Sequence, residues 1–211
     1  MPELRIEDVK LVGGRLAIDF ANTVNRHQPE VEGERLRSYP ALVAWGRHAG
    51  AISKEVTSRL LAVGQEDPEA AEAALHRAVD LREGLFRLFM ATTYGEGPDP
   101  EDLSLLNATL SQALSHLRLT PEADALLLDW AEDDPCLERV LWPVVRSAGE
   151  VLSSPEDLSR LRHCAGEDCD WIFLDQSRNR SRRWCDMADC GNRAKARRFY
   201  AQRRAARGGH K

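Results

Sequence analysis

The sequence predicts a mainly helical protein of the α+β class. A helical N-terminal domain that includes a small β-hairpin is followed by a small C-terminal module built from a hairpin and a helix. Three observations predict this arrangement. Apolar residues recur at helical spacing through most of residues 1–152, two pairs of cysteines lie within residues 164–190, and the net charge changes sign between the two regions.

The charge distribution separates the two regions. The chain has 211 residues and a net charge of −5, but residues 160–211 carry 14 Lys and Arg against 6 Asp and Glu, a net charge of +8. The other 159 residues carry 15 against 28, a net charge of −13. We place the boundary at "LSSPEDLSR", which gives domains 1–152 and 153–211, and we expect the basic domain to contact a polyanion.

The sequence predicts a cytoplasmic protein. No apolar run approaches the roughly 18 residues of a transmembrane helix. The first residues lack the basic and apolar regions of a secretory signal. We therefore expect no membrane partner, and a reducing compartment that disfavours disulfides.

The helices of residues 1–152 are predicted from their periodicity and their start and stop signals. Leu16, Phe20 and Val24 form a helical stripe over residues 15–27. Four further helices start at a serine or aspartate N-cap, and three of them stop at a glycine; they cover residues 38–50, 53–64, 67–95 and 99–117. In the last of these, leucines at a three-and-four spacing predict the buried face: Leu103, Leu106, Leu110, Leu114 and Leu117.

A hairpin and one more helix complete the N-terminal domain. Two short apolar runs around "TPEADA" predict the hairpin within residues 117–130. The helix over residues 136–152 contains Pro143, which should kink it or mark a break. Cys136, at its start, is expected to be a small structural residue.

The four C-terminal cysteines form two C-x4-C pairs separated by fifteen residues, Cys164 with Cys169 and Cys185 with Cys190. Zinc prefers four soft ligands in a tetrahedron, so these thiolates are predicted to hold one structural Zn²⁺. Metal-free thiols and an iron–sulfur cluster are the alternatives. Residues 170–184 are predicted as a hairpin that turns at "SRNR", and residues 191–209 as a helix. Together they describe a treble-clef-like zinc finger that the metal holds folded.

Positive charge gathers around this module. Four thiolates and Zn²⁺ carry a net charge of −2, so nearby arginines can neutralise the metal site, but twelve basic residues from Arg178 onward exceed that need. A basic helix with an Arg-rich turn suits DNA phosphates; RNA, a protein partner and simple solvation are the alternatives. Phe199 is expected to point toward the zinc core. The candidate DNA-binding residues are Arg178, Arg180, Arg182, Arg183, Arg193, Lys195, Arg197, Arg198 and Arg204.

The run Cys190-Gly191-Asn192-Arg193, within "FLDQSRNRSRRWCDMADCGNRAKARR", resembles the CGNR-type zinc finger. The N-terminal domain is similar to the ABATE domain that accompanies this finger, through "GGRLAIDFANTV", "LVAWGRHAG", "LREGLFRLF" and "LWPVVRSAGEVL". The resemblance implies a stress-induced transcription regulator with a helical sensing domain and a DNA-binding finger. It also assigns zinc ligation to Cys164, Cys169, Cys185 and Cys190.

Polar residues inside the apolar motifs of the N-terminal domain suggest a ligand site. Buried polar groups must be paired, so Arg82 is predicted to fork onto Asp19, with Asn22 completing a pocket for a small anionic ligand. A structural Asp–Arg bridge between two helices is the alternative. Candidates with weaker support are Asn25, Arg26, His27 and Asn107.

The sequence contains no H-E-x-x-H, G-x-S-x-G or P-loop motif, so we expect a regulator rather than an enzyme. In this interpretation the finger binds DNA and the N-terminal domain senses a ligand. The alternative is a small-molecule-binding or enzymatic helical domain whose finger binds RNA or protein. One finger has a short footprint on DNA, so a homodimer on paired half-sites is also considered.

Overall fold

The computed structural model describes residues 6, 9–24, 33–131 and 133–208. The mainly helical α+β class, with two small antiparallel hairpins, is confirmed. The N-terminal elements are α1 (Leu16–Ala21), α2 (Tyr39–His48), α3 (Lys54–Glu66), α4 (Pro68–Tyr94), α5 (Pro100–Ser115), β1 (Leu117–Glu122), β2 (Ala125–Trp130) and α6 (Leu141–Leu152). The C-terminal elements are α7 (Pro155–Arg160), β3 (Leu161–His163), β4 (Ile172–Leu174) and α8 (Asn192–Gly208).

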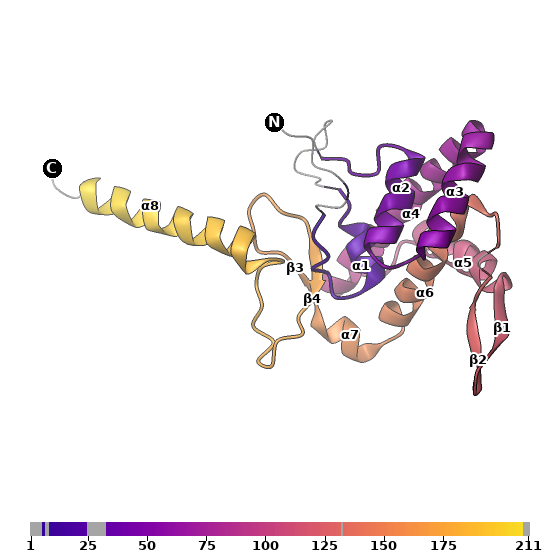
Figure 1. The fold of residues 1–211 in the computed structure, drawn as a ribbon. Helices are drawn as coiled ribbons and strands as arrows, with labels where there is room; N and C mark the ends of the chain where they lie inside the picture. The colour runs from indigo at the N-terminus through magenta and orange to yellow at the C-terminus, as the bar shows by residue number, and fades with distance from the viewer. Residues whose placement is uncertain (1–5, 7–8, 25–32, 132, 209–211) are drawn as a thin grey trace.

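We refer to residues 9–152 as the body and to residues 160–208 as the finger. In Figure 1 the helices α1 to α6 pack together, the β1–β2 hairpin extends from one end, and α8 projects away from the rest of the chain on the other side. The body core contains Phe20, Trp45, Phe89 and Trp142, all fully buried. Among the described residues, no helix is long and apolar enough to cross a membrane.

Local capping sets where the helices begin, as the sequence predicts. The Ser38, Ser53 and Asp67 side chains accept hydrogen bonds from the first-turn amides of α2, α3 and α4. Gly95 ends α4 with a φ of 72°, in the left-handed region. The predicted stop at Gly64 is wrong. Gly64 lies within α3, and a Cβ there would lie 2.9 Å from the Tyr39 ring, so this glycine lets α3 pack closely against Tyr39 of α2.

Two helices differ from their predicted form. The first is shorter than residues 15–27, because α1 ends at Ala21 and Val24 instead forms an isolated β-bridge with Glu34. In α5 the predicted leucine face is wrong at Leu103 and Leu114, which are 39% and 46% exposed. The buried face of α5 includes Asp102, which accepts two hydrogen bonds from Arg87 of α4. This fork fixes the rotation of α5 against α4.

The predicted hairpin and the last body helix are both present. Strands β1 and β2 pair antiparallel, with Leu119 opposite Leu128. Trp130 anchors the hairpin, because it is buried and its indole N–H donates to the Ala113 carbonyl at 2.7 Å. A 3₁₀ turn over Leu137–Val140 precedes α6. Pro143 therefore lies in the first turn of α6, where its missing N–H costs little, and the break is at the start of the helix.

The β3–β4 hairpin connects the finger to the body. Leu161, Ile172 and Leu174 are buried in the same hydrophobic core as the body helices. Phe173 points to the opposite face, as alternation along a strand requires, and packs with the four finger cysteines. One short hairpin thus positions the cysteine cluster against the helical core.

Candidate metal centre and nucleic-acid interface

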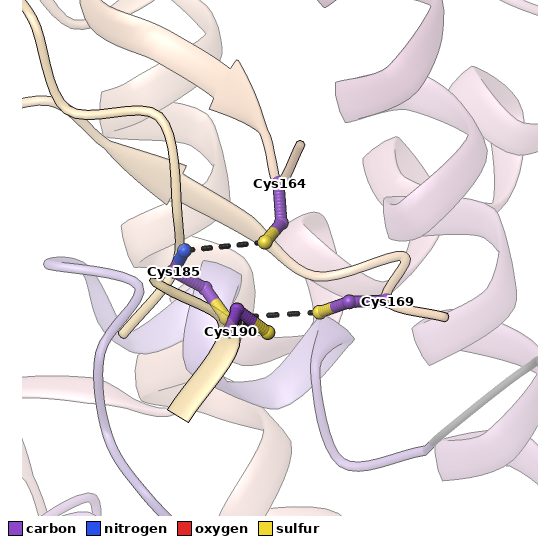
Figure 2. Close-up of side chains that lie close together, drawn as sticks. All are labelled: Cys164, Cys169, Cys185 and Cys190. Carbon is purple, nitrogen blue, oxygen red and sulfur yellow. Dashed lines mark hydrogen bonds between the residues drawn. The ribbon is translucent and has the colours of Figure 1, made fainter. Parts of the chain in front are cut away.

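The four predicted cysteine ligands meet in one buried cluster. Cys164 follows β3, Cys169 precedes β4, Cys185 lies in the following loop, and Cys190 lies in a π-helical turn, Met187–Gly191, just before α8. Their sulfurs all lie within 4.8 Å of one another, and Figure 2 shows the side chains converging. The Cys169–Cys185 and Cys185–Cys190 sulfur distances are both 3.6 Å. A zinc tetrahedron with Zn–S bonds of about 2.3 Å separates its sulfurs by about 3.8 Å, so the residues fit this metal.

The electrostatics of the cluster favour a bound cation. The pKa of Cys164 is lowered to about 2 because its sulfur accepts hydrogen bonds from the Cys169 and Cys185 side chains. The pKa of Cys169 is raised to about 12, and that of Cys185 is also raised, because these two thiols donate the hydrogen bonds to the Cys164 sulfur. Without a cation, the repulsion between thiolates this close together opposes ionisation of the whole cluster. A bound divalent cation offsets that repulsion and allows all four cysteines to be thiolates.

Hydrogen bonds to two of the cysteine sulfurs, and a tight passage of the chain at Gly166, shape the loops that carry the ligands. The Cys185 amide donates to the Cys164 sulfur at 3.3 Å (Figure 2), and the Arg193 guanidinium donates to the Cys190 sulfur at 3.0 Å. At Gly166 an added Cβ would lie 3.2 Å from the Cys169 Cβ and 3.3 Å from the Cys190 sulfur. Any larger residue at this position would push the neighbouring ligands by a few tenths of an ångström.

The segment between the cysteine pairs departs from its predicted hairpin over residues 170–184. Its first arm is β4, but β4 pairs with β3 across the first cysteine loop, and no described strand covers residues 182–184. A buried carboxylate organises this segment instead. Asp175 accepts hydrogen bonds from the Ser177 amide and hydroxyl and from the Arg182 amide. The turn is at "SRNR" as predicted, with Arg180 at a φ of 49°.

Arg182, predicted to bind DNA, has an intramolecular role. Its guanidinium donates to the carbonyls of Val12, Trp184 and Cys185 and covers the Phe173 ring at 4.2 Å. These contacts join the N-terminal segment, the loop and the cysteine cluster. Arg182 therefore has few donors left for a phosphate, and its predicted role in DNA binding is replaced by a structural one.

Helix α8 presents five of the predicted basic residues, whereas Arg178, Arg180 and Arg183 lie in the loop before it. Arg193 pairs with Asp189 at 3.5 Å as well as with Cys190, and Arg197 pairs with Asp168 at 3.0 Å and Glu167 at 3.5 Å. The expectation that Phe199 points toward the zinc core is wrong, because it is 52% exposed and packs edge-on against Tyr200. Exposed cations without an ion pair in the described chain are Arg178, Arg180, Arg183, Lys195, Arg198, Arg203 and Arg204.

A hollow of about 310 Å³ runs between α8 and the loops that precede it. Ala194 and Ala201 of α8 line one side, and Arg183, Trp184 and Glu167 lie among the facing residues. Arg197 and Arg198 also line it. Three guanidinium groups around a shallow hollow with a small-residue wall match the chemistry of a phosphate-bearing strand.

The three predicted ligand-binding residues do not come together in one pocket. Arg82 forks onto Glu34, at 2.6 and 2.7 Å, and also donates to Glu83. Asp19 instead accepts from the Gly13 amide at 2.8 Å. Asn22 bonds both backbone groups of Ile172 in β4. The predicted Asp19–Arg82 fork is thus wrong, since a nearer carboxylate takes the guanidinium. Asn107 is exposed on α5, and residues 25–27 lie outside the described residues.

Sequence reasoning missed the residues that dock the finger. Asp175 had a usable signal, because an acid directly after the apolar run "WIFL" with a serine two residues later is typical of an Asx-turn. Lys10 forms an ion pair with Asp186, and the Gly13 carbonyl accepts from the Leu174 amide. These last contacts span most of the chain, so no local pattern indicates them.

Two family models match the chain. The ABATE family, described as "Putative stress-induced transcription regulator", matches residues 14–155, and the CGNR zinc finger matches residues 160–203. The resemblance inferred from the sequence is thus confirmed. No curated protein matches the chain. The zinc-finger match and the cysteine cluster fit one structural Zn²⁺ held by Cys164, Cys169, Cys185 and Cys190.

Proposed function

Because the chain belongs to the ABATE family and carries a CGNR zinc finger, we propose that it regulates transcription by binding DNA through this finger, with α8 against the duplex. The observation that carries the proposal is α8 itself. It is a helix of 17 residues that packs on the π-helical turn at its start, and none of its described side chains is buried. Figure 1 shows it standing clear of the body.

A polyanionic partner would stabilise such a helix. Lys195, Arg198 and Arg204 are exposed on α8, and without a partner their charges repel one another along a helix with little packing. An α-helix fits the major groove of B-DNA, and guanidinium groups bind both phosphates and guanine edges. Residues 1–159, which include the body, carry a net charge of −13 and are repelled by DNA, which favours docking by the finger alone.

The body enters the proposal as the part that positions the finger. Asn22 holds β4, and the Val12 carbonyl accepts from Arg182. We propose that any signal received by the body reaches the metal centre through these contacts. The role is regulatory rather than enzymatic, in keeping with the two family descriptions.

The proposal is tested by neutralising two exposed cations of α8. In the zinc-loaded full chain, R198Q/R204Q should weaken binding to a labelled DNA duplex by about tenfold or more at moderate salt, because two phosphate contacts are lost. The matched control K54Q/R118Q removes two charges from the body, at exposed positions, and should leave the affinity unchanged. Equal losses in both variants would contradict the proposal. Tighter binding to RNA than to DNA would favour the RNA alternative.

A further inference from the structure

Each residue of the Cys190–Arg193 run has its own task around the π-helical turn. Cys190 contributes a sulfur to the cluster. At Gly191 an added Cβ would lie 2.6 Å from the Met187 sulfur, so the Met187 side chain packs directly over this glycine and would have to move to admit a larger residue. The Asn192 side chain donates to the Ala188 carbonyl at 3.0 Å, satisfying a backbone group in the wide turn. These three residues therefore shape the ligand loop, and the fourth, Arg193, begins the basic part of α8.

Arg193 faces back toward the cluster. It lies three residues after Cys190, which puts both side chains on the same face of the chain as it enters α8. One guanidinium nitrogen lies 3.0 Å from the Cys190 sulfur and another lies 3.5 Å from an Asp189 carboxylate oxygen. The aspartate orients the guanidinium, so the donor to sulfur is held in place. Arg198, on the same helix, has no such contact with the described residues.

We propose that Arg193 is a positioning residue of the metal centre, which holds Cys190 as a metal-binding thiolate. Four thiolates around Zn²⁺ carry a net charge of −2, and the cluster is buried in the finger. A guanidinium donor to one sulfur lowers that charge and draws electron density from the thiolate. Such outer contacts orient ligands, and their loss typically weakens metal binding by about 10- to 100-fold. This inference concerns the metal centre alone and holds whether or not the finger binds DNA.

The test compares two variants that remove the same charge from the same helix. In the zinc-loaded full chain, R193Q should release zinc to a chromogenic chelator about tenfold faster or more than the wild type, while R198Q should match the wild type. Alkylation by iodoacetamide, mapped by mass spectrometry, should rise at Cys190 in R193Q more than at Cys169. Equal release and alkylation in R193Q and R198Q would overturn the proposal.

A third variant separates charge from fit and guards against misfolding. R193K keeps the positive charge but loses the forked donor, so its zinc release should fall between those of wild type and R193Q. With Co²⁺ in place of Zn²⁺, the thiolate-to-metal absorption of R193K should be weaker or shifted relative to the wild type. A Co²⁺ spectrum identical to the wild type, together with wild-type zinc release, would contradict a direct role for Arg193 at Cys190.

Discussion

At the residue scale, Asn22 joins two segments that lie 150 residues apart in the chain. Its amide N–H donates to the Ile172 carbonyl at 2.8 Å, and its carbonyl oxygen accepts from the Ile172 amide at 3.0 Å. These groups are buried, so β4 obtains from one side chain the bonds that a further strand would supply. The asparagine in the conspicuous "DFANTV" motif therefore serves to dock the finger.

Replacing this side chain should loosen the docking. In N22A two buried backbone groups lose their partners, and we expect a loss of about 3 kcal/mol in the free energy of unfolding. Urea unfolding of the zinc-loaded protein measures it. N22D also loses the donor and places a buried carboxylate oxygen against the Ile172 carbonyl, so it should be no more stable than N22A at neutral pH. An N22A protein as stable as the wild type would contradict this role.

The buried carboxyl of Asp19 makes the stability of the body depend on pH in the mildly acidic range. Burial raises the pKa of its carboxyl from 3.8 to about 6, and hydrogen bonds from the Gly13 and Val12 amides oppose that rise only in part. Because the pKa is higher in the folded chain, the stabilising contribution is complete below about pH 3.8 and is lost as the pH rises through 6. The difference corresponds to about 3 kcal/mol.

The carboxyl ¹³C shift of Asp19 measures this titration directly. We expect a midpoint near 6 in the folded protein, and a midpoint below 4.5 would show that the carboxyl is well solvated. In D19N, which stays neutral, the dependence of the free energy of unfolding on pH should become flatter between about pH 4 and 6. The same slope in D19N and wild type would assign the effect to other groups.

At the element scale, α8 begins as part of the metal centre and continues as an unsupported basic helix. Its first turns are tied to the cysteine loops through Arg193 and Arg197, whereas Lys195, Arg198 and Arg204 are exposed without ion pairs in the described chain. Glu167 and Asp168 of the first cysteine loop occupy the place beside Arg197 where a phosphate would bind. They are 77% and 70% exposed, so these ion pairs are weak and open to competition.

Removing the two acids should strengthen binding to DNA. In E167Q/D168N the Arg197 guanidinium is released and two negative charges leave the proposed interface, so the affinity should rise about threefold to tenfold at fixed salt. Fluorescence anisotropy with a labelled duplex measures the change. The control E66Q/D80N removes one Glu and one Asp charge from exposed body positions and should have little effect. A lower affinity in E167Q/D168N would show that these acids support the binding surface.

Whole elements differ in how far the sequence predicts them. Helix starts such as Ser38 and Asp67 were predictable, because a cap depends on residues within one turn. The cysteine cluster was also predictable, since two close pairs leave few alternatives to one metal site. The buried face of α5 was not, because the Asp102–Arg87 fork overrides the leucine spacing.

At the scale of the whole molecule, a single hydrophobic core runs from the body into β3 and β4, while the charge is divided between an acidic body and a basic finger. Contacts such as Arg182 to Val12 join residues 170 positions apart, so no local pattern predicts that the finger depends on the body. The division of charge was evident from composition. Which cations lack an intramolecular partner became clear only with the fold, since Arg182, Arg193 and Arg197 are engaged within the chain.

The most direct test of the account is the salt dependence of DNA binding by the zinc-loaded full chain. If a majority of the seven unpaired finger cations contact phosphates, log K plotted against log salt should fall with a slope of about −4 to −6, at roughly −0.9 per contact. Protein stripped of zinc should lose this binding, since the metal holds α8 in place. A slope near zero, absence of binding at low salt, or unchanged binding without zinc would contradict the proposal that a zinc-supported basic helix binds DNA.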